Sequence, residues 1–293
     1  MADSDVRRVR ITHPERALFD SGFTKADLAA YLRAMAPALL PQLADRPVTR
    51  VCYPDGPDGE RYFVKRTPRR APAWLRRLDV SASPGNPEAK VIRASFVDDL
   101  PGLEWMASQS TVEFHTPQWR VGPRGGIRRP DRLVIDLDPG AGVDLAAIAA
   151  VAHLVRRRLA ADGLTAWPVT SGGRGIHLYA PLPGTRAARA VHAYAHQLAL
   201  ELTEQYPDLV VARAGAEHRV GKVLLDWSQN HPARTTATPY SLRHKGPAPT
   251  VAAPREWEEL GDGLTQLGPD DVVSRLRAFG DLMVKWGLTP QDH

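Results

Sequence analysis

The 293-residue chain is long enough for one large domain or two smaller ones, and its 43% hydrophobic and 24% charged residues are typical of a globular protein. A single cysteine, Cys52, excludes an internal disulfide and a multi-cysteine zinc site, and no apolar run is long enough to span a bilayer. The net charge of +5 is carried mostly by arginine, since lysine provides only six of the 38 cationic residues; composition alone fits codon bias slightly better than phosphate recognition.

The first predicted elements are a helix and a strand. In residues 23–43, apolar residues recur at helical spacing, and Thr24 together with Asp27 resembles a capping box that starts the helix. Residues 46–56 are predicted to form a strand that ends in a turn.

Basic, aromatic and turn-forming residues come next, before a second helix and strand. Residues 61–77 are dense in basic and aromatic side chains, and residues 82–91 form a loop by their Pro, Gly and Asn content. A helix is predicted at 100–110 and a strand at 111–119.

The second half of the chain alternates strands and helices. An apolar strand at 132–140 ends in two acids, Asp136 and Asp138, and leads into a helix at 143–163 that Gly163 stops. A strand at 165–170, a glycine-rich turn at 171–175 and a strand at 176–182 follow. Then come a helix at 186–205, a basic loop at 212–222, a strand at 223–230 and a helix at 269–279. The alternation is irregular and no repeat is visible, which predicts a mixed α/β (α+β) architecture.

Three acids at strand ends are the first candidate for chemistry. Because side chains two apart on a strand share a face, Asp136 and Asp138 would lie side by side and repel each other unless a positive charge lies between them. Asp226 ends a later strand, and three carboxylates suit hard divalent cations such as those of two-metal phosphoryl transfer. Taken alone, the Asp-Pro-Gly sequence fits a strand-ending turn slightly better than a metal site.

The turn at 171–175 is the second candidate, for phosphate binding. Its glycines would let backbone amides approach an anion, and Ser171, Arg174 and His177 offer donors to phosphate oxygens. No Gly-Lys-Ser/Thr follows, so it is not a Walker A loop. By itself the turn fits an ordinary hairpin better, and His177 and His115 taken singly fit interior histidines.

Together, in chain order, these motifs resemble one family. The similarity runs from about Arg10 to Asp281 and rests on six stretches: HTPQWR, RLVIDLDPG, VTSGGRGIHLYAPL, GKVLLDWSQN, TTATPYSLR and PTVAAPREWEEL. The chain resembles the polymerase domain of bacterial ligase D, in the archaeo-eukaryotic primase (primase-polymerase) superfamily. The resemblance implies a primase-like catalytic core with an RRM-like sheet and an N-terminal α/β portion.

The resemblance also implies roles for the residues that match its motifs. Asp136, Asp138 and Asp226 would be catalytic and would hold two Mn²⁺ or Mg²⁺ ions per site. Seven residues would bind the nucleotide, of which Arg174 stands where relatives often have lysine: Ser171, Arg174, His177, His115, Arg219, Arg243 and Lys65.

Two further pairs match positions that the family uses on nucleic acid. Tyr62 and Phe63 would stack on the base and template, which any base tolerates through its π face. Arg16 and Lys25 would bind the 5′-phosphate across a gap, and Lys25 comes at a helix start, where the backbone dipole favours an anion. Two solvated surface cations are the alternative for Arg16 and Lys25.

We expect one primase-polymerase domain over 1–293, softly divided into a DNA-binding portion (1–110) and a catalytic portion (111–293). The resemblance implies a DNA-directed DNA/RNA polymerase that uses NTP or dNTP to fill gaps and extend ends in non-homologous end joining. Its partners would be gapped or broken DNA with a 5′-phosphate, Ku and a separate ligase, since no Lys-x-Asp-Gly motif is present.

Three alternatives stay open: a primase-polymerase for primer synthesis or damage tolerance, a two-metal nuclease, and a non-catalytic module that binds DNA ends. The resemblance implies a preference for ribonucleotides, and the sequence alone does not decide between ribo- and deoxynucleotides. The start of the chain lacks the apolar core of a signal peptide, so we expect a cytoplasmic, nucleoid-associated protein without a membrane partner.

Overall fold

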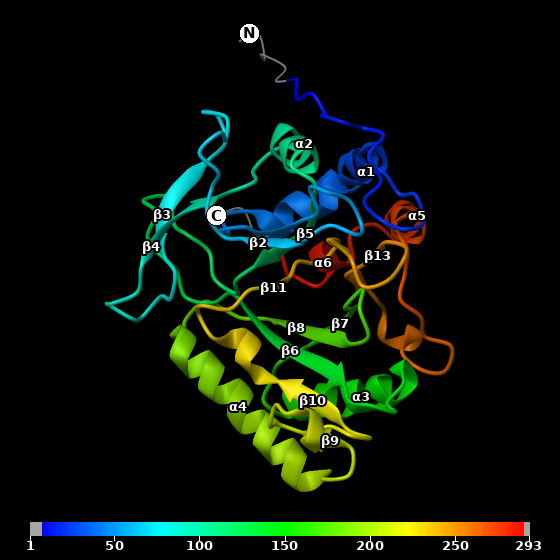
Figure 1. The fold of residues 1–293 in the computed structure, drawn as a ribbon. Helices are drawn as coiled ribbons and strands as arrows, with labels where there is room; N and C mark the ends of the chain where they lie inside the picture. The colour runs from blue at the N-terminus through cyan, green and yellow to red at the C-terminus, as the bar shows by residue number, and fades with distance from the viewer. Residues whose placement is uncertain (1–7, 290–293) are drawn as a thin grey trace.

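A six-stranded sheet dominates the second half of the chain in the computed structural model, which describes residues 8–289 (Figure 1). The strand order is β14-β7-β8-β6-β10-β9. The strands and the two long helices between them are β6 Arg132–Pro139, α3 Leu145–Ala161, β7 Trp167–Thr170, β8 Ile176–Pro181, α4 Ala188–Gln205, β9 Val210–Val211, β10 Val223–Asp226 and β14 Ala253–Pro254.

The centre of this sheet has the topology of an RRM. Apart from the two-residue strand β9, the chain runs β6-α3-β7-β8-α4-β10, and these four strands lie in the order β7-β8-β6-β10, with antiparallel pairing at each of the three contacts between them. This β-α-β-β-α-β arrangement is the one expected of a ferredoxin-like or RRM-like sheet. The predicted mixed α/β fold with an RRM-like core is therefore confirmed.

The alternation of side chains along β6 decides which face of the sheet is free for a site. Leu133, Ile135 and Leu137 point to one face and pack in a core shared with α3 and α4. Burying an aliphatic side chain of this size stabilises the fold by about 1.5–3 kcal/mol. Figure 1 shows α3 and α4 together on that side of the sheet. Asp136 therefore faces the opposite side, toward the first half of the chain.

A second sheet, with the order β11-β5-β1-β2, lies over that free side (Figure 1). Its strands and the helices packed near it are α1 Lys25–Leu43, β1 Thr49–Cys52, β2 Tyr62–Val64, α2 Leu100–Ser108, β5 Thr111–Thr116 and β11 Thr236–Ala237. The predicted capping box starts α1: the Asp27 amide donates to Thr24 Oγ1 at 3.2 Å, and the Thr24 amide donates to Asp27 Oδ2 at 2.8 Å. Because β11 pairs with β5, this sheet draws on both halves of the chain.

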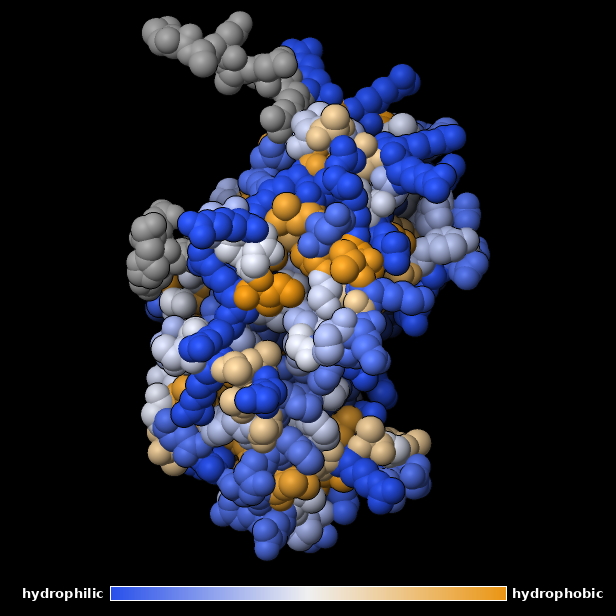
Figure 2. Space-filling view, turned by 90° about the vertical axis from the view of Figure 1, so that its left-hand side faces the viewer, coloured by the Kyte–Doolittle hydropathy of each residue, from blue (hydrophilic) through white to orange (hydrophobic). Residues whose placement is uncertain are grey.

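The remaining elements are short and lie at the edges: β3 Arg77–Ser81, β4 Val91–Ser95, β12 Leu242–Arg243, β13 Thr250–Val251, α5 Pro269–Phe279 and α6 Leu282–Lys285, with 3-10 turns at Ala216–His218, Trp227–Asn230 and Trp257–Glu259. The loop predicted at 82–91 joins the β3–β4 hairpin. The face that includes this hairpin is mostly hydrophilic, with scattered apolar side chains (Figure 2). Within residues 8–289, no helix combines the length and the apolar character that a membrane span requires.

Three predicted strands are shorter in the structure: those expected at 46–56 and 111–119 are β1 and β5, and the third is β10. The strand expected at 223–230 ends at Asp226, and residues 227–230 form a 3-10 turn instead. The Asp226 carboxylate causes this, because its Oδ1 accepts hydrogen bonds from the Ser228 amide at 3.0 Å and the Ser228 hydroxyl at 2.6 Å. Asx-type bonds of this kind compete with strand pairing.

A buried ionic cluster joins the segment after α1 to the start of β6. Arg46, which follows α1 and is fully buried, donates to both carboxylate oxygens of Asp131 at 2.6 Å. Arg120 donates to the same carboxylate at 2.5 Å, and Arg132 at the start of β6 lies close enough for its charge to lower the pKa of Asp131. One carboxylate therefore holds several cations in the interior beside the six-stranded sheet.

Candidate active site

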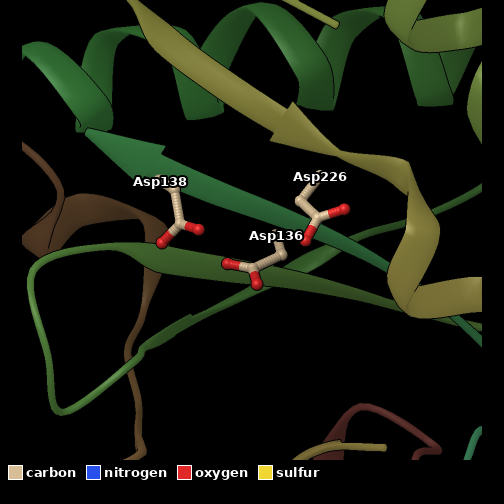
Figure 3. A group of neighbouring side chains, drawn as sticks. All are labelled: Asp136, Asp138 and Asp226. Atoms are coloured by element: carbon tan, nitrogen blue, oxygen red, sulfur yellow. The ribbon is translucent and has the colours of Figure 1, made fainter. Parts of the chain in front are cut away.

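Three carboxylates converge on the free face of the RRM-like sheet. Asp136 and Asp138 share one face of β6, and Asp226 at the end of β10 is paired directly with Asp136. Each offers one oxygen such that these three atoms lie within 4.8 Å of one another. Figure 3 shows the three carboxylates gathered at one place, from the two neighbouring strands.

The electrostatics of these acids suit the binding of a cation. Burial, and then the charges of Asp138 and Asp226, raise the pKa of Asp136 well above its ordinary value. The pKa of Asp138 is also raised, by burial first, and Asp226 adds to the rise. Asp136 Oδ1 is buried without a hydrogen-bond partner, although His177 Nε2 lies 3.4 Å away. A divalent cation bound by oxygen ligands would satisfy all three acids.

Gln229 bridges two of the acids, which the sequence did not indicate. Its Nε2 donates to Asp226 Oδ2 at 3.0 Å and to Asp136 Oδ2 at 3.3 Å. The 3-10 turn after β10 brings it there, and its only sequence signal is its place three residues after Asp226. The amide leaves Asp136 Oδ1 without a hydrogen bond, whereas Asp226 Oδ1 accepts from the amide and the hydroxyl of Ser228.

The glycine-rich turn at 171–175 lies directly beside the acids. A Cβ at Gly175 would lie 2.3 Å from Leu137 O and 3.4 Å from Asp138 Oδ1, so only glycine allows this approach. Gly172 has φ +68°, and a Cβ there would lie 2.6 Å from the Arg243 side chain. Ser171 Oγ accepts from the amides of Gly173 and Gly175 at 3.1 Å, which leaves its hydroxyl hydrogen free to donate.

Three arginines from separate segments surround the acids. The charges of Arg219, Arg174 and Arg243 all lower the pKa of Asp138, against the effect of its burial. Arg243 NH1 donates to Ser171 O at 2.7 Å, and Arg219 NH2 donates to Pro139 O at 3.2 Å. Arg219 Nε is buried and has no partner. Such a group of guanidinium donors over carboxylates suits a bound polyphosphate.

Two histidines complete this side of the site. His177 on β8 is paired with Asp136, and burial, followed by the charge of Arg243, lowers its pKa to about 3. His115 on β5 comes from the second sheet, and its Nε2 lies 2.8 Å from Glu113 Oε2. Both rings are therefore neutral at pH 7, since burial also lowers the pKa of His115. Lys65, the remaining residue predicted to bind the nucleotide, donates from Nζ to the backbone oxygen of Ala233 at 3.4 Å.

The aromatic pair lies on an exposed edge strand. Tyr62 and Phe63 on β2 are 42% and 56% exposed, which is unusual for large apolar rings and suits a stacking surface. Adjacent strand residues point to opposite faces, and only Phe63 is in edge contact with His115, with ring centroids 5.8 Å apart. Phe63 therefore lies beside His115, whereas Tyr62 donates to Glu60.

Arg16 and Lys25 lie close together near the start of α1. Burial, and then the charge of Arg16, lower the pKa of Lys25. Lys25 is only 3% exposed, and its Nζ donates to Ser108 O at 2.8 Å and to Thr12 Oγ1 at 3.3 Å. Arg16 is half-buried and donates to Pro54 O. Within residues 8–289, neither cation makes a hydrogen bond or an ion pair with the three acids.

Comparison with known proteins gives one consistent result. The family model of the LigD primase-polymerase domain matches residues 24–283. The multifunctional non-homologous end joining protein LigD of Mycolicibacterium smegmatis is 40% identical over 279 residues, which are 94% of this chain and 36% of that protein. The bifunctional LigD of Bacillus subtilis is 31% identical over 289 residues, 97% of this chain and 45% of that protein.

A solved structure agrees with these relatives. The polymerase domain of Mycobacterium tuberculosis ligase D, determined in complex with DNA, superimposes with a TM-score of 0.90 at 40% identity. The match covers 97% of this chain and 99% of that one. The chain thus spans almost all of one solved domain but only 36% and 45% of the length of these two full relatives.

Proposed function

The chain belongs to the LigD primase-polymerase domain family, and from this premise we propose that it is a template-directed nucleotidyltransferase that fills short gaps and extends DNA ends in break repair. The resemblance seen in the sequence is thereby confirmed. The observation that carries the proposal is the convergence of Asp136, Asp138 and Asp226 directly beside the glycine-rich turn. A nuclease needs the acids alone, whereas the arginines around the turn favour a triphosphate substrate.

Each group around the acids has a definite task in this reaction. Asp136, Asp138 and Asp226 would hold two divalent cations, Mn²⁺ or Mg²⁺, which when bound neutralise charge on the attacking and leaving oxygens. Arg174, Arg219 and Arg243, with the Ser171 hydroxyl and His177, would bind and orient the triphosphate of an NTP or dNTP. The primer 3′-oxygen then attacks the α-phosphorus in line, and pyrophosphate leaves.

The nucleic acid would lie between the acids and the exposed edge of the second sheet. Phe63, with Tyr62 beside it, would stack on the base or template, and Lys65 would contact a phosphate. We propose that residues 1–110 and 111–293 act as one unit, since Phe63 on β2 contacts His115 on β5. Gapped or broken DNA, Ku and a separate ligase are the proposed partners, in a cytoplasmic, nucleoid-associated setting.

The test is primer extension on a gapped duplex that carries a downstream 5′-phosphate, with Mn²⁺ and either ribo- or deoxynucleotides. We expect template-matched addition at the primer end and an intact primer when nucleotide is left out. Binding to the gap without any addition would point to a non-catalytic module, and shortening of the labelled primer without nucleotide would point to a nuclease.

Arg16→Ala is expected to weaken the preference for a 5′-phosphate. The loss of one charged hydrogen bond to phosphate costs about 1.5–3 kcal/mol, so gapped DNA with the phosphate should bind at least about tenfold more weakly. Affinity for the same gap without the phosphate should change little. Arg33→Ala, an arginine on α1 paired with Glu104 at the surface, is the control. Equal weakening on both DNAs would contradict the assignment.

A further inference from the structure

Glu113 is a buried acid between the two sheets that the motifs did not single out. It lies on β5, its side chain is 4% exposed, and both of its oxygens are used. Oε2 accepts from His115 Nε2 at 2.8 Å and from Arg243 Nε at 3.1 Å, and Oε1 accepts from the His244 amide at 3.0 Å. Its partners thus include two residues assigned above to the nucleotide.

We propose that Glu113 is a positioning residue of the nucleotide site, which holds His115 and Arg243 in place for the triphosphate. The inference rests on the proposed function. Glu113 and His115 share one face of β5, and Arg243 is reached across from β12. Arg243 continues the connection, because its NH1 donates to Ser171 O at 2.7 Å. One carboxylate thereby connects the second sheet to the glycine-rich turn beside the acids.

The charge state of Glu113 supports this role. Burial alone would raise its pKa, but the hydrogen bond from His115 and the charge of Arg243 outweigh it and hold the pKa at about 2. An ionised carboxylate only accepts hydrogen bonds, so His115 Nε2 must carry its proton and Nδ1 is left as the free nitrogen. Glu113 therefore fixes both the orientation of the ring and its tautomer.

Glu113 acts through its neighbours and not on the substrate. Its negative charge would repel a triphosphate, and its hydrogen bonds already occupy it on three sides. Glu113 also offsets the positive charge around His115. Arg243 and Lys245 supply this charge, and both lower the pKa of His115. Without the carboxylate, the Arg243 side chain would lose the partner that aims its Nε away from solvent and its NH1 toward Ser171.

Glu113→Gln tests the proposal, because it keeps the shape and removes the charge. We expect the KM for the nucleotide in primer extension to rise about tenfold or more, the loss expected for charged hydrogen bonds, while kcat and the half-saturating Mn²⁺ concentration change less than about threefold. Glu113→Asp keeps the charge but is too short to reach both partners, so its KM should also rise. Glu104→Gln, which removes the acid of the surface pair with Arg33, should behave as wild type.

A merely structural role would give a different pattern. It would lower the thermal midpoint and the active fraction of the protein and leave the KM of the folded fraction unchanged, and this result would overturn the proposal. In a His115→Ala background, Glu113→Gln should raise the KM less than it does alone, since part of its effect passes through His115. Equal effects in both backgrounds, together with an unchanged KM for Arg243→Lys, would also overturn it.

Failure of the proposed function is distinguishable from failure of this inference. If the wild-type chain extends no primer, the proposed function fails, and direct titration with a fluorescent nucleoside triphosphate and Mn²⁺ still compares the variants. Weaker binding by Glu113→Gln than by wild type in that titration supports the positioning role. Equal binding, or no binding by wild type, contradicts it.

Discussion

Primer extension by the Asp136→Asn, Asp138→Asn double variant is expected to fall about a thousandfold or more below wild type. The two amides keep the shape of the acids and remove the charge that binds divalent cations, whose stabilisation of phosphoryl transfer amounts to several kcal/mol. Single-turnover incorporation into a gapped duplex with Mn²⁺ measures the loss. Asp208→Asn with Asp262→Asn, two exposed acids, is the control and should retain full activity.

The same variant should be more stable than wild type when divalent ions are chelated. Burial and mutual repulsion raise the pKa of Asp136 and Asp138, so these acids reduce the stability of the metal-free fold increasingly as the pH rises through their folded-state pKa. The amides remove this cost, and Mn²⁺, which should raise the thermal midpoint of wild type, should leave that of the variant unchanged. Wild-type extension, or an equal Mn²⁺ shift in both proteins, would contradict the metal site.

Asp131→Asn is expected to lower the free energy of unfolding by about 3 kcal/mol, since it leaves buried guanidinium groups without their counterion. Arg46 is fully buried and Arg120 nearly so, and both donate to the Asp131 carboxylate. The estimate lies at the low end for buried pairs because the Asp131 side chain is itself 32% exposed. Urea unfolding at pH 7 measures the difference.

The pH dependence of this loss has a definite sign. The folded-state pKa of Asp131 lies far below its ordinary value: burial opposes this, but the charges of Arg46 and Arg120 outweigh it. Its contribution is therefore fully present above about pH 4, the unfolded pKa, and is lost as the pH falls toward the folded-state pKa, so the difference between variant and wild type should narrow in acid.

Asp162→Asn provides the matched control for Asp131. Asp162 has the same 32% exposure but pairs with Arg158 on the surface of α3, where an ion pair contributes at most about 1 kcal/mol. If Asp131→Asn lowers the free energy of unfolding no more than Asp162→Asn does, the buried cluster does not stabilise the contact between the segment after α1 and the start of β6.

Local sequence signals predicted the elements whose cause is local. The capping box of Thr24 and Asp27 starts α1 as expected, and the alternation along β6 placed Asp136 and Asp138 on one face. Asp226 could be grouped with them by its residue type and its place at a strand end, but its direct pairing with Asp136 spans ninety positions in the chain and has no local signal. The roles of the individual site residues remain predictions.

Features that depend on distant partners could not be predicted from single residues. Glu113 acquires its role from Arg243, 130 positions away, and nothing in its own neighbourhood indicates this. Gln229 reaches the acids because the Asp226 carboxylate turns the chain after β10, where periodicity suggested a continuous strand. Strands of two residues, such as β11, are too short to show any alternation.

The number of Mn²⁺ ions bound beside a non-hydrolysable nucleotide, counted by electron paramagnetic resonance on wild type and on Asp136→Asn, tests the central claim most directly. We predict two ions per wild-type chain in the presence of the nucleotide. For the variant we predict either no bound Mn²⁺ or only weak binding. Equal Mn²⁺ binding by the two proteins, or none by wild type, would contradict a metal centre at Asp136, Asp138 and Asp226.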